Sequence, residues 1–423
     1  MDKEKSPKKD IGQVFLEELN APKDQKKKKG RLGQILLIPF LAVFTGLIVG
    51  GIFIVITDVP VYKAFGLSFG SGLVAIGDVL SRAFIALFTG AFGNPAFIIQ
   101  ALQSGDPAQI RSAFVPITES LVISVPYILA GLAVALGFRS GVFNIGAEGQ
   151  LFIGAMTGTF VAYSIPGLPM IIHLPLSLLA GFAGGALWGF IPGWLKARTG
   201  GHEVINTIML NYIAFLLNSW LLRGPMKDPT TDIPISPTIQ PGAMLPQFFE
   251  QPIRFNLGFF LALAMVYVVY WFLFKTTWGF NLRAVGSNSS AARYAGINVP
   301  RNMILAMSLS GGLAALAGVT EILGLNHHLA ASFSSGYGFD SIALALLGNN
   351  HPVGVLLAAL LFGALRNGST AMQLAGIPSD IIPVMQAVIL IFVSAPTIIR
   401  TIYRVKAPPV EEQGFTVTGW GGR

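Results

Sequence analysis

Long apolar runs separated by short polar segments dominate the sequence. Many of these runs reach about 20 residues, the length an α-helix needs to cross the hydrocarbon core of a bilayer. They predict an all-α, polytopic integral membrane protein, because a soluble fold does not need apolar runs of this length. The predicted transmembrane helices lie near residues 33–57, 119–138, 144–163, 170–194, 204–222, 256–275, 302–324 and 379–399.

The apolar stretch 341–365 is divided in its first half by residues 347–352 (LGNNHP). The division leaves a short first piece and a longer second piece, which predicts a half-helix or re-entrant element. Non-helical backbone at membrane depth is tolerated only inside protein or along a cavity. Counting this broken region as two passes gives about ten transmembrane helices.

A second irregular stretch covers residues 71–102. It is apolar but is interrupted by Asp78, Arg82, Asn94 and Pro95. We expect an external segment that lies on the membrane or dips into it.

The charge distribution predicts the orientation. Charged residues make up only 11% of the chain, the mean hydropathy is +0.65 and the net charge is +8. With ten transmembrane helices, most Lys and Arg residues fall on the side of the membrane that holds the N-terminus. The positive-inside rule therefore predicts that both termini are cytoplasmic. The expected location is the cell membrane, as a multi-pass protein. The expected organisation is a basic cytoplasmic extension, a transmembrane domain and a cytoplasmic tail, at residues 1–32, 33–399 and 400–423.

The basic run Lys26–Lys29 directly precedes the first predicted helix. We expect it to fix topology and to contact anionic membrane lipid, and we expect no nucleic-acid partner.

The sequence offers no recognisable catalytic motif. Cysteine is absent, and there is no G-x-x-x-x-G-K-[ST], H-E-x-x-H or G-x-S-x-G pattern. The adjacent pair His327–His328 makes a poor metal site without further ligands. We therefore expect no catalytic residues, no metal site and no cofactor bound by this chain. A polytopic protein of this kind is typically a pore, a carrier or the membrane half of a pump.

The first informative motif is the segment 139–150 (RSGVFNIGAEGQ), between two predicted helices. Its glycines permit close backbone approach, while Asn144, Glu148 and Gln150 place polar groups at the membrane boundary. A carboxylate there is costly unless it is paired or faces water. Two interpretations remain open: a broken helix that lines a translocation path, or a structural hydrogen-bond network that holds a helix turn.

The predicted helix 204–222 carries further polar residues. Asn206, Thr207, Asn211 and Tyr212 recur at spacings of four and five residues on one stripe of this helix, so they are candidates either to contact a substrate or to hydrogen-bond between helices. On the preceding helix, residues 181–189 (GFAGGALWG) predict a small-residue face for helix packing.

The second informative motif is the cytoplasmic segment 279–300 (GFNLRAVGSNSSAARYAGINVP). Ser287 or Asn288 provides an N-cap, the following residues form about two helical turns, and Gly296 is placed as a left-handed C-terminal residue. A simple connecting loop needs no capped helix of this length. Small side chains on the helix permit close approach of another surface, and two arginines supply charged anchors, so we interpret the segment as a docking element.

Together the two motifs resemble the permease subunits of ATP-binding-cassette importers that handle branched-chain amino acids, simple sugars and nucleosides. The motif FNIGAEGQ and the segment 199–212 (TGGHEVINTIMLNY) are most similar to the nucleoside branch of this family. The resemblance extends over about residues 119–395. The resemblance implies that the segment 276–301 holds a coupling helix seated on an ATPase. The residues that inherit the coupling role are Arg283, Gly286, Ala291, Ala292, Arg293 and Gly296.

The resemblance also implies partners. They are ATPase subunits that use ATP and Mg²⁺, a second and non-identical permease, and an extracellular substrate-binding lipoprotein. The substrate path would be lined by Asn144, Glu148, Gln150, Asn206, Asn211 and Tyr212. Two alternatives stay open: a permease for simple sugars, and an ion-coupled secondary carrier in which Glu148 titrates.

Overall fold

The computed structural model describes residues 27–378 and 380–405. Residues 45–394 form one compact unit, and the described residues on either side of it, 27–44 and 395–405, belong to a second unit. Most of the predicted N-terminal extension and of the C-terminal tail therefore lies outside the described residues.

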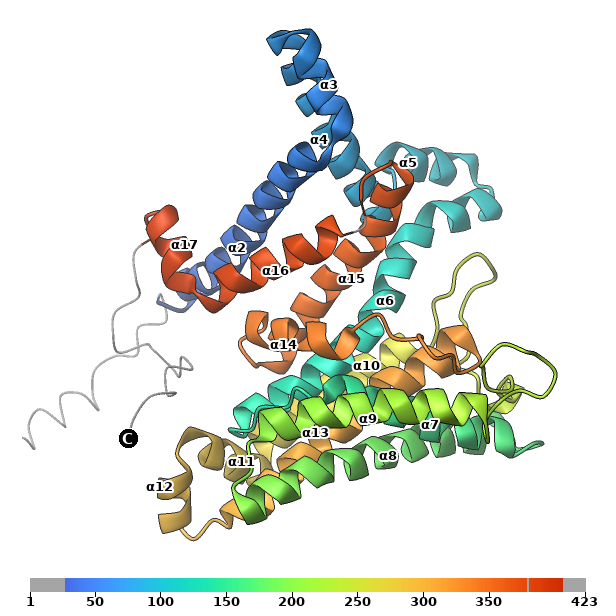
Figure 1. Cartoon of the computed structure of the whole chain (residues 1–423), viewed down its shortest axis with the longest axis vertical. Helices are drawn as coiled ribbons and strands as arrows, with labels where there is room; N and C mark the ends of the chain where they lie inside the picture. The colour runs from blue at the N-terminus through green and yellow to red at the C-terminus, as the bar shows by residue number, and fades with distance from the viewer. Residues whose placement is uncertain (1–26, 379, 406–423) are drawn as a thin grey trace, which may run out of the picture. The chain divides into compact units, whose positions relative to one another are not determined.

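The described chain is built from helices, and it contains isolated β-bridges but no β-strand (Figure 1). In chain order the elements are α2 (Lys27–Thr57), α3 (Val59–Leu67), α4 (Phe69–Phe92), α5 (Pro95–Ser104), α6 (Pro107–Arg139), α7 (Ala147–Ser164), α8 (Met170–Thr199), α9 (Glu203–Arg223), η1 (Pro241–Ala243), α10 (Gly258–Lys275), α11 (Thr277–Ser287), α12 (Ser289–Tyr294), α13 (Val299–Glu321), the π-helical turn η2 (Ile322–Asn326), α14 (Tyr337–Leu347), α15 (Pro352–Leu374), α16 (Ile381–Ser394) and α17 (Pro396–Ile402).

Within the described residues, 8 helices are long and apolar enough to cross a membrane. They are α2, α4, α6, α8, α9, α10, α13 with its π-helical turn, and α15. The shorter helices α7, α14 and α16 have 18, 11 and 14 residues. This confirms an all-α, multi-span protein, and it makes the predicted number of ten an approximate one. The predicted helix 379–399 is interrupted, because α16 ends at Ser394 and α17 begins at Pro396.

The stretch 71–102 is more regular than its sequence indicates. Asp78 and Arg82 do not interrupt α4, because they lie one turn apart and form an ion pair of 3.1 Å. The break comes later, where Asn94 caps α5 and Pro95 begins it. By length and composition α4 is able to span a bilayer.

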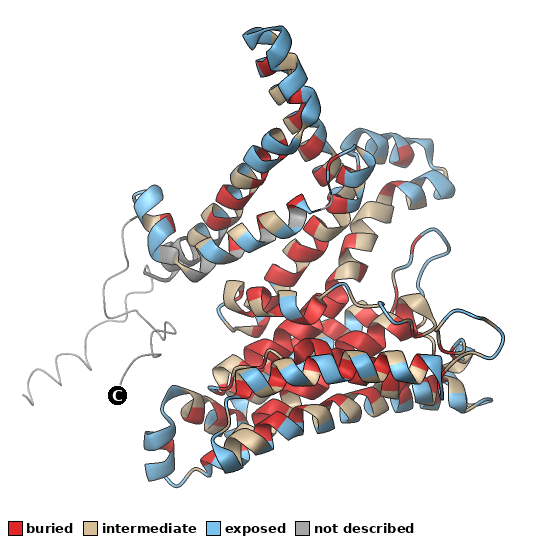
Figure 2. Ribbon diagram, viewed as in Figure 1, coloured by how far each residue is buried: buried red, intermediate tan, exposed pale blue. Residues whose placement is uncertain are grey.

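Helices α6 and α13 form the centre of the unit, as the red ribbons of Figure 2 show. Of the residues in the most apolar 18-residue window of each helix, 83% are buried in α6, 72% are buried in α13 with its π-helical turn, and 22% are buried in α9. Apolar side chains surround α6 on all sides between Tyr127 and Leu136, which is typical of a central helix. Helices α7 and α8 pack against α13, and α10, α14 and α15 pack against α6.

Glycines on α8 permit its close contact with α13, the most extensive contact between two of the described helices. Gly181, Gly185, Gly189 and Gly193 recur every fourth residue and face α13. A Cβ atom at Gly185 would lie 2.3 Å from the Cβ atom of Ala315. The small-residue face predicted for α8 is therefore confirmed.

Replacing Gly185 with Val is expected to separate α8 from α13, because the added methyl groups have no space against the opposing backbone. Overpacking of this kind costs about 1–3 kcal/mol or more. Thermal unfolding followed by size-exclusion chromatography measures the loss. Gly77→Val in α4 is the matched control, since nothing lies within 4 Å of its Cβ position. Equal stability of the two variants would contradict this description of the interface.

The broken element between residues 341 and 365 is confirmed in its main feature. Helix α14 ends at Leu347, and Asn349 and Asn350 follow with φ of 51° and 52°. The guanidinium of Arg139 donates to both of their carbonyl oxygens, at 3.2 and 3.0 Å, and so holds the turn. At 1.5 Å per residue, the 11 residues of α14 extend about 16 Å, which is half a bilayer and not a full pass.

Candidate functional site

A buried polar network surrounds the start of α7. The Asn144 side-chain amide nitrogen donates to Gln150 Oε1 at 2.7 Å and to Ser310 Oγ of α13 at 2.8 Å. Ser310 in turn donates to the Ala133 carbonyl oxygen of α6 at 2.7 Å. Asn144 and Gln150 are each 1% exposed, so their polar groups are occupied by protein. Asn144 therefore connects the start of α7 to α13, and Gln150 holds the Asn144 side chain.

The first backbone N–H groups of α7 have no side-chain cap of the usual kind. Instead the Gly146 N–H donates to Asn144 Oδ1 at 3.0 Å, and the Gly149 N–H donates to Asn211 Oδ1 of α9 at 2.8 Å. The Asn211 amide also donates to the Ile145 carbonyl oxygen at 3.0 Å. These bonds satisfy backbone groups that would otherwise be costly inside the membrane. For Asn144, Gln150 and Asn211 the geometry supports the structural interpretation.

The four polar residues predicted to share one stripe of α9 do not all lie on the same face. Asn211 is buried against α7, whereas Tyr212 is 60% exposed and Asn206 is half-buried. Successive helical residues differ by about 100°, so neighbours such as Asn211 and Tyr212 diverge. The buried stripe of α9 contains the predicted Thr207 and Asn211, together with the polar residues Glu203 and Asn218.

Glu148 is 3% exposed and connects the starts of two helices. Its carboxylate accepts from the Ser334 hydroxyl at 2.6 Å and from the Gly338 backbone N–H at 2.5 Å. Gly338 lies in the first turn of α14, and Glu148 lies in the first turn of α7. The positive ends of both helix dipoles therefore favour the anionic carboxylate without a cationic partner.

Only glycine fits at position 338. A Cβ atom there would lie 2.3 Å from the Glu148 backbone nitrogen. The contact between α14 and α7 therefore depends on the missing side chain as well as on the carboxylate.

A second carboxylate stands in the same first turn of α14. Asp340 accepts a hydrogen bond of 3.0 Å from the Tyr127 hydroxyl of α6, and it interacts electrostatically with Arg366 of α15. The Tyr127 ring meets the Tyr337 ring edge-on, with centroids 5.0 Å apart. Three helices thus bring carboxylate, phenol and guanidinium groups together beside Glu148.

Our sequence reasoning missed this Tyr127–Asp340 cluster. The sequence signal for this cluster was an acidic and a basic residue, Asp340 and Arg366, in the apolar segments that form α14 and α15. Arg366 follows directly after the apolar stretch 341–365, but it lies inside a helix, because α15 continues to Leu374.

Aromatic rings lie next to Glu148 on the α9 side. Phe152 of α7 contacts Phe215 of α9 and Phe333, with centroid separations of 4.8 and 4.7 Å. Phe333 directly precedes Ser334, the hydrogen-bond donor to Glu148. Aromatic rings packed edge-on or tilted against one another therefore adjoin the segment that leads into α14 and donates to Glu148.

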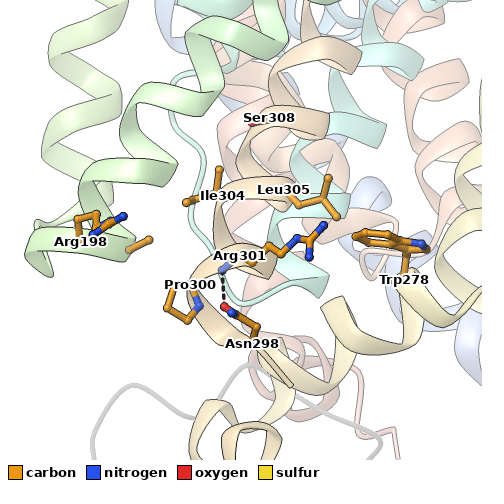
Figure 3. Close-up of a pocket in the computed structure, with 9 residues that line it drawn as sticks. Arg198, Trp278, Asn298, Pro300, Arg301, Ile304, Leu305 and Ser308 are labelled. Carbon is orange, nitrogen blue, oxygen red and sulfur yellow. Dashed lines mark hydrogen bonds between the residues drawn. The ribbon is translucent and has the colours of Figure 1, made fainter. Parts of the chain in front are cut away.

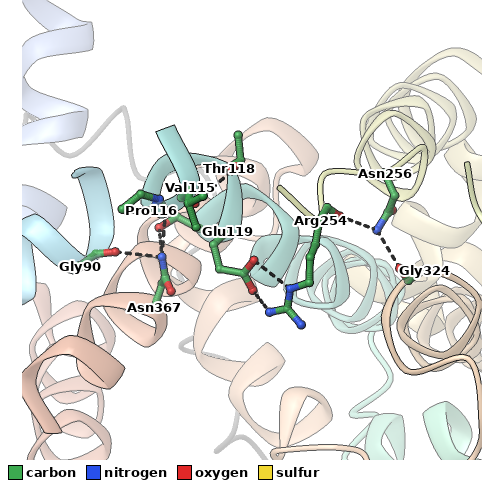
Figure 4. A network of polar contacts seen from close by, with 10 residues as sticks. Gly90, Val115, Pro116, Thr118, Glu119, Arg254, Asn256, Gly324 and Asn367 are labelled. Carbon is green, nitrogen blue, oxygen red and sulfur yellow. Dashed lines mark hydrogen bonds and ion pairs between the residues drawn. The ribbon is translucent and has the colours of Figure 1, made fainter. Parts of the chain in front are cut away.

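A polar network at the other end of α6 is shown in Figure 4. Glu119 pairs with Arg254, whose carbonyl oxygen accepts from the Asn256 amide at 3.2 Å. The same amide donates to the Gly324 carbonyl oxygen at 3.3 Å. Asn367 of α15 donates to the carbonyl oxygen of Gly90 at 2.9 Å and so ties α15 to α4. These contacts hold the predicted outer ends of several helices.

An ion pair joins the end of α8 to the start of α9. Lys196 of α8 pairs with Glu203, the first residue of α9.

The adjacent histidines follow the π-helical turn, and His327 has a left-handed backbone with φ of 57°. Burial, together with the neighbouring His328, lowers the pKa of His327. No group of three or more His, Asp or Glu residues that could hold a metal occurs within residues 27–378 and 380–405.

The predicted docking helix is present as α12. Asn288 is its N-cap and accepts from the Ala291 N–H at 3.0 Å, and Gly296 follows with φ of 83°. The outward surface of α12 carries exposed Ala291, Arg293 and Tyr294, of which Tyr294 is 97% exposed. We call this set the α12 surface.

Three of the proposed coupling residues face their own chain. Ala292 is 4% exposed and packs with Val285 and Val299. A Cβ atom at Gly286 would lie 2.3 Å from the Arg139 carbonyl oxygen. Arg283 donates to the Leu273 carbonyl oxygen at 2.9 Å. A short amphipathic helix must bury one face, and Ala292 lies on that face, so these residues position the α12 surface and do not belong to it.

Comparison with known proteins agrees with this architecture. Residues 117–394 match the family described as "Branched-chain amino acid transport system / permease component". This chain therefore belongs to that permease family, and it is a transport subunit with several membrane-spanning helices.

Individual relatives are similar over most of the chain. The guanosine ABC transporter permease protein NupP of Bacillus subtilis is 38% identical over 87% of this chain and 95% of its own length. The glucose ABC transporter permease protein TsgB13 of Haloferax volcanii is 36% identical over 84% of this chain and 86% of its own length. The nucleoside ABC transporter permease protein NupB of Lactococcus lactis is 36% identical over 74% of this chain and 87% of its own length. No solved structure matches.

Proposed function

We propose that this chain is the permease subunit of an ATP-driven importer and forms the translocation path for nucleosides across the cell membrane. The observation that carries the proposal is its similarity to the guanosine permease NupP over 372 residues, nearly the full length of that protein. The chain itself binds no cofactor; ATP and Mg²⁺ are used by a partner ATPase.

The Tyr127–Asp340 cluster, together with Glu148, is the part of the path that we propose meets the substrate. A nucleoside carries ribose hydroxyls, which donate to carboxylates, and a base, whose flat face stacks on aromatic rings. Asp340 and the Phe152–Phe333 pair offer both kinds of group within neighbouring elements.

A simple sugar is the second candidate substrate, because the glucose permease TsgB13 is almost as similar. Uptake of labelled guanosine by the reconstituted transporter, with unlabelled guanosine, uridine or glucose as competitor, separates the two. We expect both nucleosides to compete and glucose to have no effect. Competition by glucose but not by uridine would favour the sugar permease.

We propose three kinds of partner: ATPase subunits, a second and non-identical permease, and an extracellular substrate-binding lipoprotein. The α12 surface is the proposed contact with the ATPase, and rigid-body motion of that contact would gate the path. Affinity purification of a tagged copy in detergent tests this. An ATPase and a second permease should co-purify, and recovery of this chain alone as a homodimer would contradict the heterodimeric core.

The proposed topology places both termini, α11 and α12 in the cytoplasm. A cysteine at Ser289 should be labelled only from inside, a tag within residues 228–247 should be reached from outside, and reporters at both termini should read as cytoplasmic. The charge bias provides the physical reason. An external C-terminus would show that the number of crossings is odd, with α4 the first helix to re-examine.

A further inference from the structure

A groove of ≈ 630 Å³ opens where α8 ends and α13 begins, beside the start of α11 (Figure 3). Its lining includes Arg198, Trp278, Asn298, Arg301, Ile304 and Leu305. None of these residues belongs to the path or to the α12 surface. The groove therefore needs an explanation of its own.

The mouth of the groove is basic. Arg198 lies in the last turn of α8, and Arg301 lies in the first turn of α13. Both side chains are exposed, and neither forms an ion pair with a carboxylate of the described residues. The Arg301 guanidinium lies over the Trp278 ring, 5.5 Å from its centroid, which orients it in the groove. The exposed arginines at the mouth, one of them oriented by Trp278, favour an anion.

The wall of the groove becomes apolar along α13. Ile304 and Leu305 follow Arg301 by about one turn, or about 5 Å, in the direction of the membrane-spanning part of the helix. Figure 3 shows these side chains on the turn beyond the arginine, with Ser308 further on. Tryptophan beside the end of a span is typical of the membrane–water interface. The groove therefore has a positively charged mouth and an apolar wall beyond it, which suits a ligand with an anionic head and an apolar tail.

We propose that this groove binds an anionic phospholipid of the cytoplasmic leaflet. The lipid phosphate lies at Arg198 and Arg301, and an acyl chain lies along Ile304 and Leu305. Free phosphate would use the same arginines but would leave the apolar wall uncovered. The inference rests on the proposed cytoplasmic position of α11 and α12, and its test reads lipid binding and not transport.

Titration of the purified transporter with phosphatidylglycerol or phosphatidylcholine, followed by native mass spectrometry, tests the proposal. We expect Arg198→Gln and Arg301→Gln each to weaken phosphatidylglycerol binding about fivefold, since a basic residue near an anionic bilayer contributes about 1 kcal/mol. Lys275→Gln is the matched control, because this exposed lysine lies on the same side and does not line the groove. Phosphatidylcholine should bind more weakly to the parent protein and should not distinguish the variants.

Two outcomes would overturn the lipid assignment by pointing to another occupant. If inorganic phosphate displaces the lipid and Ile304→Asn has no effect, the site binds phosphate alone. If the arginine variants release the ATPase but retain phosphatidylglycerol, the groove is a protein contact. Unchanged phosphatidylglycerol binding in both arginine variants would also refute the proposal, whether or not guanosine uptake is confirmed.

Discussion

Replacing Glu148 with Leu is expected to abolish transport. The substitution leaves the Gly338 N–H and the Ser334 hydroxyl without their acceptor, and each unsatisfied buried group costs about 1–3 kcal/mol. The starts of α7 and α14 then separate, and the Tyr127–Asp340 cluster loses its geometry. Uptake by the reconstituted transporter measures the effect, and size-exclusion chromatography shows whether the chain still assembles.

Glu148→Gln distinguishes the permease from the ion-coupled carrier. The amide keeps an acceptor for the Gly338 N–H and presents a donor to Ser334, whose hydroxyl can also accept. An ATP-driven permease should therefore retain substantial transport in this variant, whereas a carrier that titrates Glu148 should lose its coupling. Loss of transport with normal assembly, together with pH-dependent uptake in the parent, would favour the carrier.

Ser334→Ala tests the hydrogen bond to Glu148 from the donor side, and Ser335→Ala is its matched control. Ser335 is exposed, whereas Ser334 donates to the carboxylate at 2.6 Å. We expect only the Ser334 variant to reduce uptake.

Removal of the Tyr294 side chain is expected to uncouple the ATPase. Tyr294 is 97% exposed on α12, and a protruding tyrosine is typical of residues that dominate a protein interface. We expect Tyr294→Ala to weaken ATPase association by about 2 kcal/mol or more, with loss of transport and of substrate-stimulated hydrolysis. Co-purification and ATPase assays measure these effects.

Tyr267→Ala serves as its control. Tyr267 is also exposed, at 68%, but it lies on α10 within a membrane span. Membrane insertion should be normal in both variants. Normal ATPase association in the Tyr294 variant would show that the α12 surface is not the coupling contact.

Local features of the chain were predictable because their causes are local. Helix positions follow from apolar length, and the end of α14 follows from the Gly348–Asn350 turn before Pro352. The Asn288 cap and the left-handed Gly296 follow from the intrinsic preferences of single residues. The central part of the family resemblance also lay in short motifs, and the family match over residues 117–394 confirmed it.

Which polar groups meet was decided only by the tertiary structure. Glu148 contacts Ser334 and Gly338, which are 186 and 190 residues away in the sequence. No spacing within one helix encodes such a contact, because it depends on how α7, α14 and α6 pack. The same packing buries Ala292 and leaves Tyr294 exposed. The sequence by itself therefore determined the class of protein and most of its long helices, and packing between distant helices determined which polar residues meet.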